Sequence, residues 1–191
     1  MMERQESAPG LWVGGALPAN VQLGVNTMVT GDLAFKRFHS TRDPALVIGA
    51  DCTIDGAQFA LGEHAQVQIG NHCYFTNAVL LSELDIRIGN FVMIGWNTTI
   101  ADTDFHPIAP AQRVVDAIAL SPLGNMADRP PIPRKAVIID DDVWIGASVV
   151  ILKGVHIGKG AFIEPGSVVT RDVPPGARVI GNPARPIGAP S

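Results

Sequence analysis

An aliphatic residue recurs at every sixth position in the last third of the chain. Six such positions follow one another without a break, and all six are β-branched: Ile139, Ile145, Ile151, Ile157, Ile163 and Val169. A shorter run with the same spacing occurs earlier, at Ile88, Ile94 and Ile100. A period of six fits neither the 3.6-residue repeat of an α-helix nor the two-residue alternation of a long strand.

The period fits short strands that turn a corner every six residues. β-branched side chains suit the flat strands, and glycine or asparagine suits the corners. Three strands then close one triangular coil, and stacked coils enclose a narrow interior, in keeping with 47% hydrophobic but only 6% aromatic residues. We therefore predict an all-β fold, a parallel β-helix of 18-residue triangular coils, as a single domain over residues 1–191.

The repeat stops between Ile100 and Val137, where six prolines exclude a regular strand ladder. We expect an inserted loop over residues 101–135, with a turn or two of helix at 113–120, that packs against a neighbouring subunit. The C-terminal coils should then span 136–180, followed by a short tail at 181–191. Residues 1–10 are expected to be flexible, and residues 1–44 show no clear repeat.

Composition and charge exclude several classes of protein. A formal net charge of −4 disfavours non-specific nucleic-acid binding. No apolar run approaches the roughly 18 residues that cross a bilayer, and residues 1–10 lack the apolar core of a signal peptide. The two cysteines, Cys52 and Cys73, have no metal-type spacing, so we interpret them as core residues of a cytoplasmic protein.

The pairs Ile145-Gly146 and Ile157-Gly158 carry the repeat signature of a known family. Residues 45–187 resemble the hexapeptide-repeat acyltransferases, most of all the galactoside and maltose O-acetyltransferases and the polysaccharide-type O-acetyltransferases. The resemblance implies that the coils wind left-handed, against the usual right-handed crossover, and that three chains form a homotrimer with active sites between subunits. It also implies acetyl-CoA as the acyl donor.

The string DTDFHP at 102–107 is similar to the stretch in which these O-acetyltransferases place their catalytic histidine before a proline. The resemblance makes His106 the general base, with Asp102 or Asp104 either orienting the imidazole or binding sugar hydroxyls. Asn77 and Glu83 correspond loosely to the polar residues that bind the acceptor in the sugar acetyltransferases.

Two further strings, DVWIG at 142–146 and GNPAR at 181–185, are similar to the family's coenzyme A site. The resemblance implies that Trp144 flanks the pantetheine arm and that the Ala147 N–H lies near the thioester oxygen. It also implies that one set of residues lines the adenine and phosphate end: Thr170, Arg171 and Arg185. Pro165 replaces a small residue near the coenzyme and removes an N–H, while Asp140 replaces the glycine of an Ile-Gly pair.

The remaining histidines are expected at the surface or between coils: His39, His64, His72 and His156. The γ-class carbonic anhydrases bind zinc on a β-helix through three histidines, two of which lie five residues apart. No His-x4-His occurs here, so we expect no metal site.

These motifs predict an acetyl-CoA-dependent O-acetyltransferase acting on a saccharide hydroxyl, in polysaccharide biosynthesis, by direct attack in a ternary complex. Histidine suits the role of base because its ordinary pKa, near 6.5, leaves it mostly neutral at pH 7. Three alternatives remain open: N-acetylation of a nucleotide amino sugar, O-acetylation of a streptogramin-type antibiotic, and a non-catalytic assembly subunit.

Overall fold

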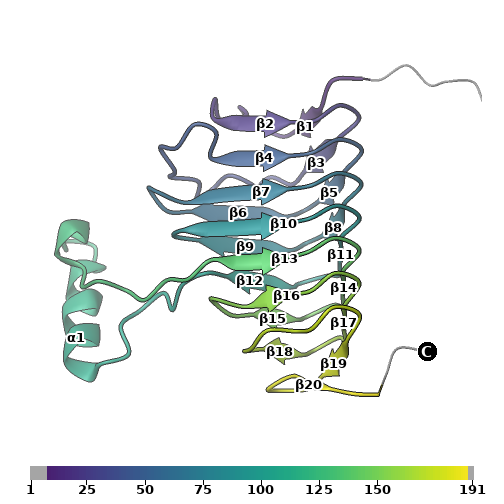
Figure 1. Ribbon diagram of the computed structural model, residues 1–191. Helices are drawn as coiled ribbons and strands as arrows, with labels where there is room; N and C mark the ends of the chain where they lie inside the picture. The colour runs from purple at the N-terminus through teal and green to yellow at the C-terminus, as the bar shows by residue number, and fades with distance from the viewer. Residues whose placement is uncertain (1–7, 189–191) are drawn as a thin grey trace, which may run out of the picture.

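The computed structural model describes residues 8–188, which form a three-sided tube of stacked parallel strands with one projecting helix (Figure 1). Residues 1–7 of the segment predicted to be flexible, and 189–191 of the tail, lie outside the described residues. The predicted all-β parallel β-helix is confirmed, with the added helix in the insertion.

Each side of the tube is one sheet, and from Leu46 to Val169 the chain visits the three sheets in turn. The first sheet comprises β2 (Val21–Leu23), β4 (Leu46–Ile48), β7 (Gln66–Ile69), β10 (Asp85–Ile88), β13 (Val137–Ile139) and β16 (His156–Ile157). The second comprises β6 (Gln58–Leu61), β9 (Val79–Ser82), β12 (Thr99–Ala101), β15 (Val150–Ile151) and β18 (Val168–Val169).

The third sheet is the longest and includes both outermost strands of the tube. It comprises β1 (Leu11–Val13), β3 (Met28–Thr30), β5 (Thr53–Asp55), β8 (Tyr74–Thr76), β11 (Met93–Ile94), β14 (Trp144–Ile145), β17 (Phe162–Ile163), β19 (Arg178–Ile180) and β20 (Arg185–Pro186). All its pairs are parallel except the last, in which β20 runs antiparallel to β19.

The aliphatic positions of the repeat form the core, as the period predicts. One column runs through the third sheet, and each of its members is at most 3% exposed: Ile54, Phe75, Ile94, Ile145, Ile163 and Val179. Ile145 and Ile163 are partners 18 residues apart, as predicted, whereas Ile54 and Phe75 lie 21 apart because the early corners are longer.

Corners require backbone conformations that most side chains avoid. Asn77 follows β8 at φ 48°, and Asn97 and Ser148 occupy the same corner in later coils at φ 58° and 57°. Asparagine tolerates this left-handed region better than most residues do. Asn77 therefore has a backbone role at a corner, on the exposed outside of the tube.

The insertion leaves the tube after β12 and returns at β13. Its helix α1 spans Pro110–Ala119, and a short 3-10 helix, η1, spans Met126–Asp128. The helix begins before the predicted residue 113 because Pro110 occupies its first turn, where a missing N–H is not needed. Figure 1 shows α1 standing away from the tube at the level of β12 and β13.

Candidate active site

His106 lies at the base of the insertion, shortly after β12, and two complete coils of the tube follow the insertion. Its backbone N–H donates to the Asp104 carbonyl over 2.7 Å, and Phe105 between them has a φ of 62°. This left-handed conformation is strained for a bulky residue, and Phe91 adopts it as well, at φ 60°. The turn presents the imidazole to solvent, with 59% of its side chain exposed.

The imidazole is held on one side by a carboxylate from α1. His106 Nδ1 lies 2.6 Å from Asp116 Oδ2, and the Asp116 side chain is only 2% exposed. With Nδ1 engaged, Nε2 is the ring nitrogen left to meet a substrate.

Arg129 in turn binds Asp116. Its Nε donates to Asp116 Oδ1 over 2.7 Å, and its Nη2 approaches Asp116 Oδ2 at 3.4 Å. The Arg129 hydrogen bonds, followed by the His106 hydrogen bond, lower the pKa of Asp116 below its ordinary value. Asp116 is therefore an ionised carboxylate at neutral pH.

Asp102 does not contact the imidazole. Its carboxylate is fully buried and accepts hydrogen bonds from the Ser82 hydroxyl at 2.7 Å and from the backbone N–H groups of Glu83, Leu84 and Asp85 at 2.8, 3.0 and 2.7 Å. It closes the turn between β9 and β10, and the carboxylate that contacts the imidazole is that of Asp116.

Asp104 also points away from the imidazole. Its Oδ1 accepts from Lys153 Nζ at 2.7 Å, which ties the base of the insertion to the following coil. Its Oδ2 is buried without a hydrogen-bond partner among the described residues.

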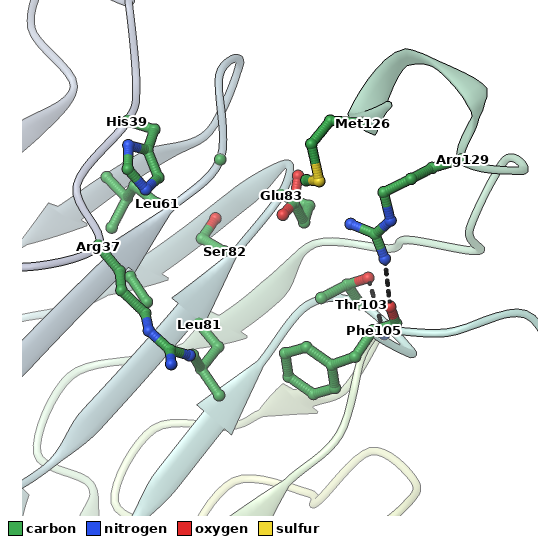
Figure 2. A pocket seen from close by; sticks show the side chains of 12 residues that line it. Arg37, His39, Leu61, Leu81, Ser82, Glu83, Thr103, Phe105, Met126 and Arg129 are labelled. Carbon is green, nitrogen blue, oxygen red and sulfur yellow. Dashed lines mark hydrogen bonds between the residues drawn. The ribbon is translucent and has the colours of Figure 1, made fainter. Parts of the chain in front are cut away.

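A cleft of about 280 Å³ opens beside this segment, on the outer face of β6 and β9. Figure 2 shows its two walls and the residue between them: Arg37 and His39 on one side, Phe105, Met126 and Arg129 on the other, and Glu83 in the middle. The Glu83 carboxylate lies across Gly62, where any Cβ would collide with it, and no donor in residues 8–188 hydrogen-bonds to it. The cleft thus includes Glu83, whereas Asn77 is absent from its lining.

His106 lines a second hollow, of about 330 Å³, along α1 together with Arg113, Asp116, Ala117 and Leu120. Arg129 connects the two hollows, because it lines the cleft and also binds Asp116.

The residues predicted to contact coenzyme A lie on two different edges of the tube. Trp144 is on the outer face of β14 and stacks on Phe162 with ring centroids 4.1 Å apart, and the Arg178 guanidinium lies 5.2 Å from the Phe162 ring. Ala147 and Pro165 occupy the corner between the third and second sheets.

Thr170 and Arg171 are exposed at the other end of the second sheet, on the same edge as the insertion. Arg185 is exposed on β20, and its guanidinium donates to the neighbouring Ala184 carbonyl at 2.9 Å. Among residues 8–188, no acceptor hydrogen-bonds to the Ala147 N–H.

The sequence did not identify Asp116, Arg129, Arg37 or His39 as site residues. The only sequence signal concerns Asp116, which is the one acidic residue of α1; with Ala119 it is also one of the two buried residues of that helix. Its partner Arg129 and the cleft residues depend on how the insertion folds back, which no local pattern encodes.

At the corner that contains Asp140, where the family has glycine, side-chain hydrogen bonds connect neighbouring coils. Asp141 Oδ1 accepts from the Asn90 N–H at 2.7 Å, and Asp140 pairs with His156 Nε2 at 3.0 Å. Within residues 8–188, His, Cys, Asp and Glu side chains form no group of three or more that could hold a metal ion. No helix in the same range is long and apolar enough to span a membrane.

The repeat of this chain is similar to that of known acetyltransferases. The family model described as bacterial transferase hexapeptide (six repeats) matches residues 136–171. Galactoside O-acetyltransferase of Lactococcus lactis is 36% identical over 137 residues, which cover 71% of this chain and 59% of that protein. The chain therefore spans about three-fifths of the length of this curated relative.

Two crystal structures of a hexapeptide-repeat-containing acetyltransferase from Vibrio cholerae are similar. One is 30% identical with a TM-score of 0.58 and covers 82% of this chain and 76% of that chain. The other, a complex with acetyl-CoA, is 32% identical with a TM-score of 0.56 and covers 69% and 64%. The repeat, the tube and these similarities together show that the chain belongs to the hexapeptide-repeat acetyltransferase family.

Proposed function

We propose that this chain is an acetyl-CoA-dependent O-acetyltransferase that acetylates a saccharide hydroxyl, with His106 as the general base. The observation that supports the proposal is an exposed imidazole whose Nδ1 is engaged by a buried carboxylate, which leaves Nε2 free, next in sequence to Phe105, which lines the cleft. Relatives named as a galactoside O-acetyltransferase and as a complex with acetyl-CoA support the acceptor class and the donor.

In the proposed reaction His106 Nε2 takes the proton of the acceptor hydroxyl as its oxygen attacks the acetyl carbonyl of acetyl-CoA. The tetrahedral intermediate then collapses, the carbon–sulfur bond breaks, and His106 returns the proton to the departing thiolate. The unpaired N–H of Ala147 is a candidate donor to the thioester oxygen, whose negative charge grows along this path. The route involves no acyl-enzyme.

The acceptor is proposed to occupy the cleft that Glu83 and Phe105 line. The unpaired Glu83 carboxylate can accept hydrogen bonds from sugar hydroxyls, and the partly exposed Phe105 ring offers an apolar surface to a sugar ring. Asp102 and Asn77 are not part of this proposal, because the first closes a turn and the second forms a corner.

The donor is proposed to lie along Trp144, with Thr170, Arg171 and Arg185 toward its phosphates and Pro165 beside it. Because these residues occupy two edges of the tube, we propose that one site is completed between two chains of a homotrimer. The free, buried thiols of Cys52 and Cys73 fit the predicted cytoplasmic location.

The apolar face of the insertion supports association. Val114 and Ile118 on α1 are 60% and 65% exposed, and Leu123 in the turn after the helix is 100% exposed, which is unusual for a segment that projects into water. Sedimentation of the wild type should give a trimer, and Ile118→Asp should shift it toward monomers while the circular dichroism of the tube persists. A wild-type monomer at micromolar concentration would contradict the trimer.

The activity test measures free thiol released from acetyl-CoA in the presence of a panel of sugars. We expect His106→Ala to lower kcat by about 10²–10⁴, the usual contribution of a positioned base. His64→Ala is the matched control, since His64 is exposed on the same edge of the tube. Equal rates for wild type and His106→Ala would show that His106 is not the general base. Mass spectrometry and NMR of the product distinguish O-acetylation from N-acetylation.

A further inference from the structure

Four groups at the root of the insertion form a closed circuit of hydrogen bonds. His106 Nδ1 binds Asp116, Arg129 Nε binds Asp116, and Arg129 Nη2 donates to the Phe105 carbonyl at 2.9 Å, which returns the circuit to the residue before His106. The sequence separates these members widely, so the circuit exists only because α1 and η1 fold back over the Phe105 turn.

We propose that Asp116 is a positioning residue for His106, that Arg129 positions Asp116, and that aiming the imidazole is a principal task of the inserted segment. The inference rests on the proposed function, in which His106 is the base.

Asp116 fixes the protonation pattern of the imidazole. An ionised carboxylate can only accept hydrogen bonds, so Asp116 Oδ2 at 2.6 Å requires a proton on His106 Nδ1. In the neutral ring the lone pair is then on Nε2, the atom that must take the proton of the acceptor hydroxyl. Asp116 thus selects the reactive tautomer as well as the orientation of the ring.

Asp116 is itself held in place. Its side chain is 2% exposed, and both of its oxygens are engaged, Oδ1 by Arg129 Nε and Oδ2 by His106 with Arg129 Nη2 at 3.4 Å. The other cation that lines the hollow beside it, Arg113, donates to the Ile108 carbonyl instead. Arg129 therefore supplies the charge that keeps a buried carboxylate ionised.

Arg129 also holds the backbone that precedes His106. Phe105 has a strained φ of 62°, and the Arg129 bond to its carbonyl holds that turn against relaxation. A movement of α1 would carry Asp116, Arg129 and the turn together, so the ring and its carboxylate keep their geometry.

During turnover the proton from the acceptor oxygen goes to Nε2 and then to the thiolate of coenzyme A, while the Nδ1 proton and the charge of Asp116 do not change. The carboxylate stabilises the imidazolium that exists between these two transfers. Loss of a carboxylate with this role lowers kcat by up to about 10⁴ in a serine protease.

The kinetic test compares Asp116→Asn, Asp116→Ala, Arg129→Lys and Arg129→Ala with the wild type. We expect kcat to fall by about 10²–10⁴ for both Asp116 variants, with the KM for acetyl-CoA changed by less than about 3-fold. Arg129→Lys should recover part of the kcat that Arg129→Ala loses. Asp128→Asn is the matched control, because Asp128 is an exposed carboxylate in the same insertion and should leave kcat unchanged.

A second readout does not depend on activity. In the folded wild type, ¹⁵N NMR of histidine-labelled protein should show His106 with a protonated Nδ1 and an unprotonated Nε2 above the titration of the ring. Asp116→Ala should shift the ring toward the other tautomer. A wild-type ring protonated on Nε2, or kcat of Asp116→Ala within 3-fold of the wild type, would overturn the proposal.

The two readouts separate the two proposals. If His106→Ala is fully active, the proposed function fails, whereas the tautomer still reports whether Asp116 positions the ring. If the Asp116 variants unfold, the wild-type tautomer and the Arg129→Lys rescue decide the positioning role.

Discussion

The buried carboxylate of Asp102 offers a sharp test, because Asp104 only two residues away is held quite differently. Asp102 accepts four hydrogen bonds from the turn between β9 and β10, three of them on Oδ2 and one on Oδ1 from the Glu83 N–H. In Asp102→Asn the amide oxygen can replace Oδ2, but the NH₂ group must then face the Glu83 N–H. The side-chain NH₂ group and the Glu83 N–H would then face each other as two donors, whereas in the wild type the Glu83 N–H donates to Asp102 Oδ1.

The expected loss of stability follows from replacing this carboxylate with an amide. A buried donor left unsatisfied costs about 1–3 kcal/mol, and three hydrogen bonds to a charged oxygen become weaker bonds to a neutral one. We expect Asp102→Asn to lower the free energy of unfolding by about 3 kcal/mol, which corresponds to a fall in Tm of roughly 6–12 °C for a chain of this size. Asp104→Asn loses one partly exposed ion pair with Lys153, worth about 0–1 kcal/mol.

The assay is thermal unfolding followed by circular dichroism, at one protein concentration for all variants, with kcat measured on the folded protein at 25 °C. We expect both variants to keep kcat within about 3-fold, because neither carboxylate contacts the imidazole. If Asp102→Asn were as stable as Asp104→Asn, or lost kcat as expected for Asp116→Asn, the structural role given to Asp102 would be wrong.

Three further predictions follow from other parts of the structure. Ile145→Ala should lower the free energy of unfolding by about 2–5 kcal/mol in urea denaturation, because Ile145 is fully buried in the core column; an unchanged midpoint would contradict this packing. Trp144→Ala should raise the KM for acetyl-CoA about 10-fold with little change in kcat, as removal of uniform binding does; an unchanged KM would exclude the contact with the donor. Arg129, then His106, lowers the pKa of Asp116 in the folded chain, so Asp116 adds stability above the unfolded value near 4, and this is lost as pH falls through the lowered folded value. The Tm of the wild type should therefore fall more steeply below pH 4 than that of Asp116→Asn, and parallel curves would refute the linkage.

The tube could be predicted from the sequence because its physics is local and repeated. Every aliphatic position of the last six repeats faces the same interior, so one residue in six suffices to predict a coil, as Ile145 and Ile163 show. The longer early coils were harder to place because an extra residue at a corner changes the spacing but not the packing.

The candidate site could be predicted only in part. His106 was identified from the residues beside it, and the same adjacency suggested Asp102 and Asp104 as its partners. The carboxylate that meets the imidazole is ten residues further on, because the fold-back of α1 rather than the local sequence decides which acid reaches the ring. Contacts made by an insertion outside the repeat are tertiary, so a periodic pattern carries no information about them.

The reversed direction of β20 has a consequence for how these molecules behave at high concentration. A parallel solenoid resembles a stack to which another stack could be added end to end, with backbone hydrogen bonds joining one molecule to the next. Arg185 and Pro186 run against β19 over this end of the third sheet, and proline has no N–H to offer an incoming strand. Arg185 and Pro186 thus leave this edge of the third sheet a poor partner for the strand of another molecule, and we expect a Pro186→Val variant to associate end to end more readily in sedimentation at high concentration.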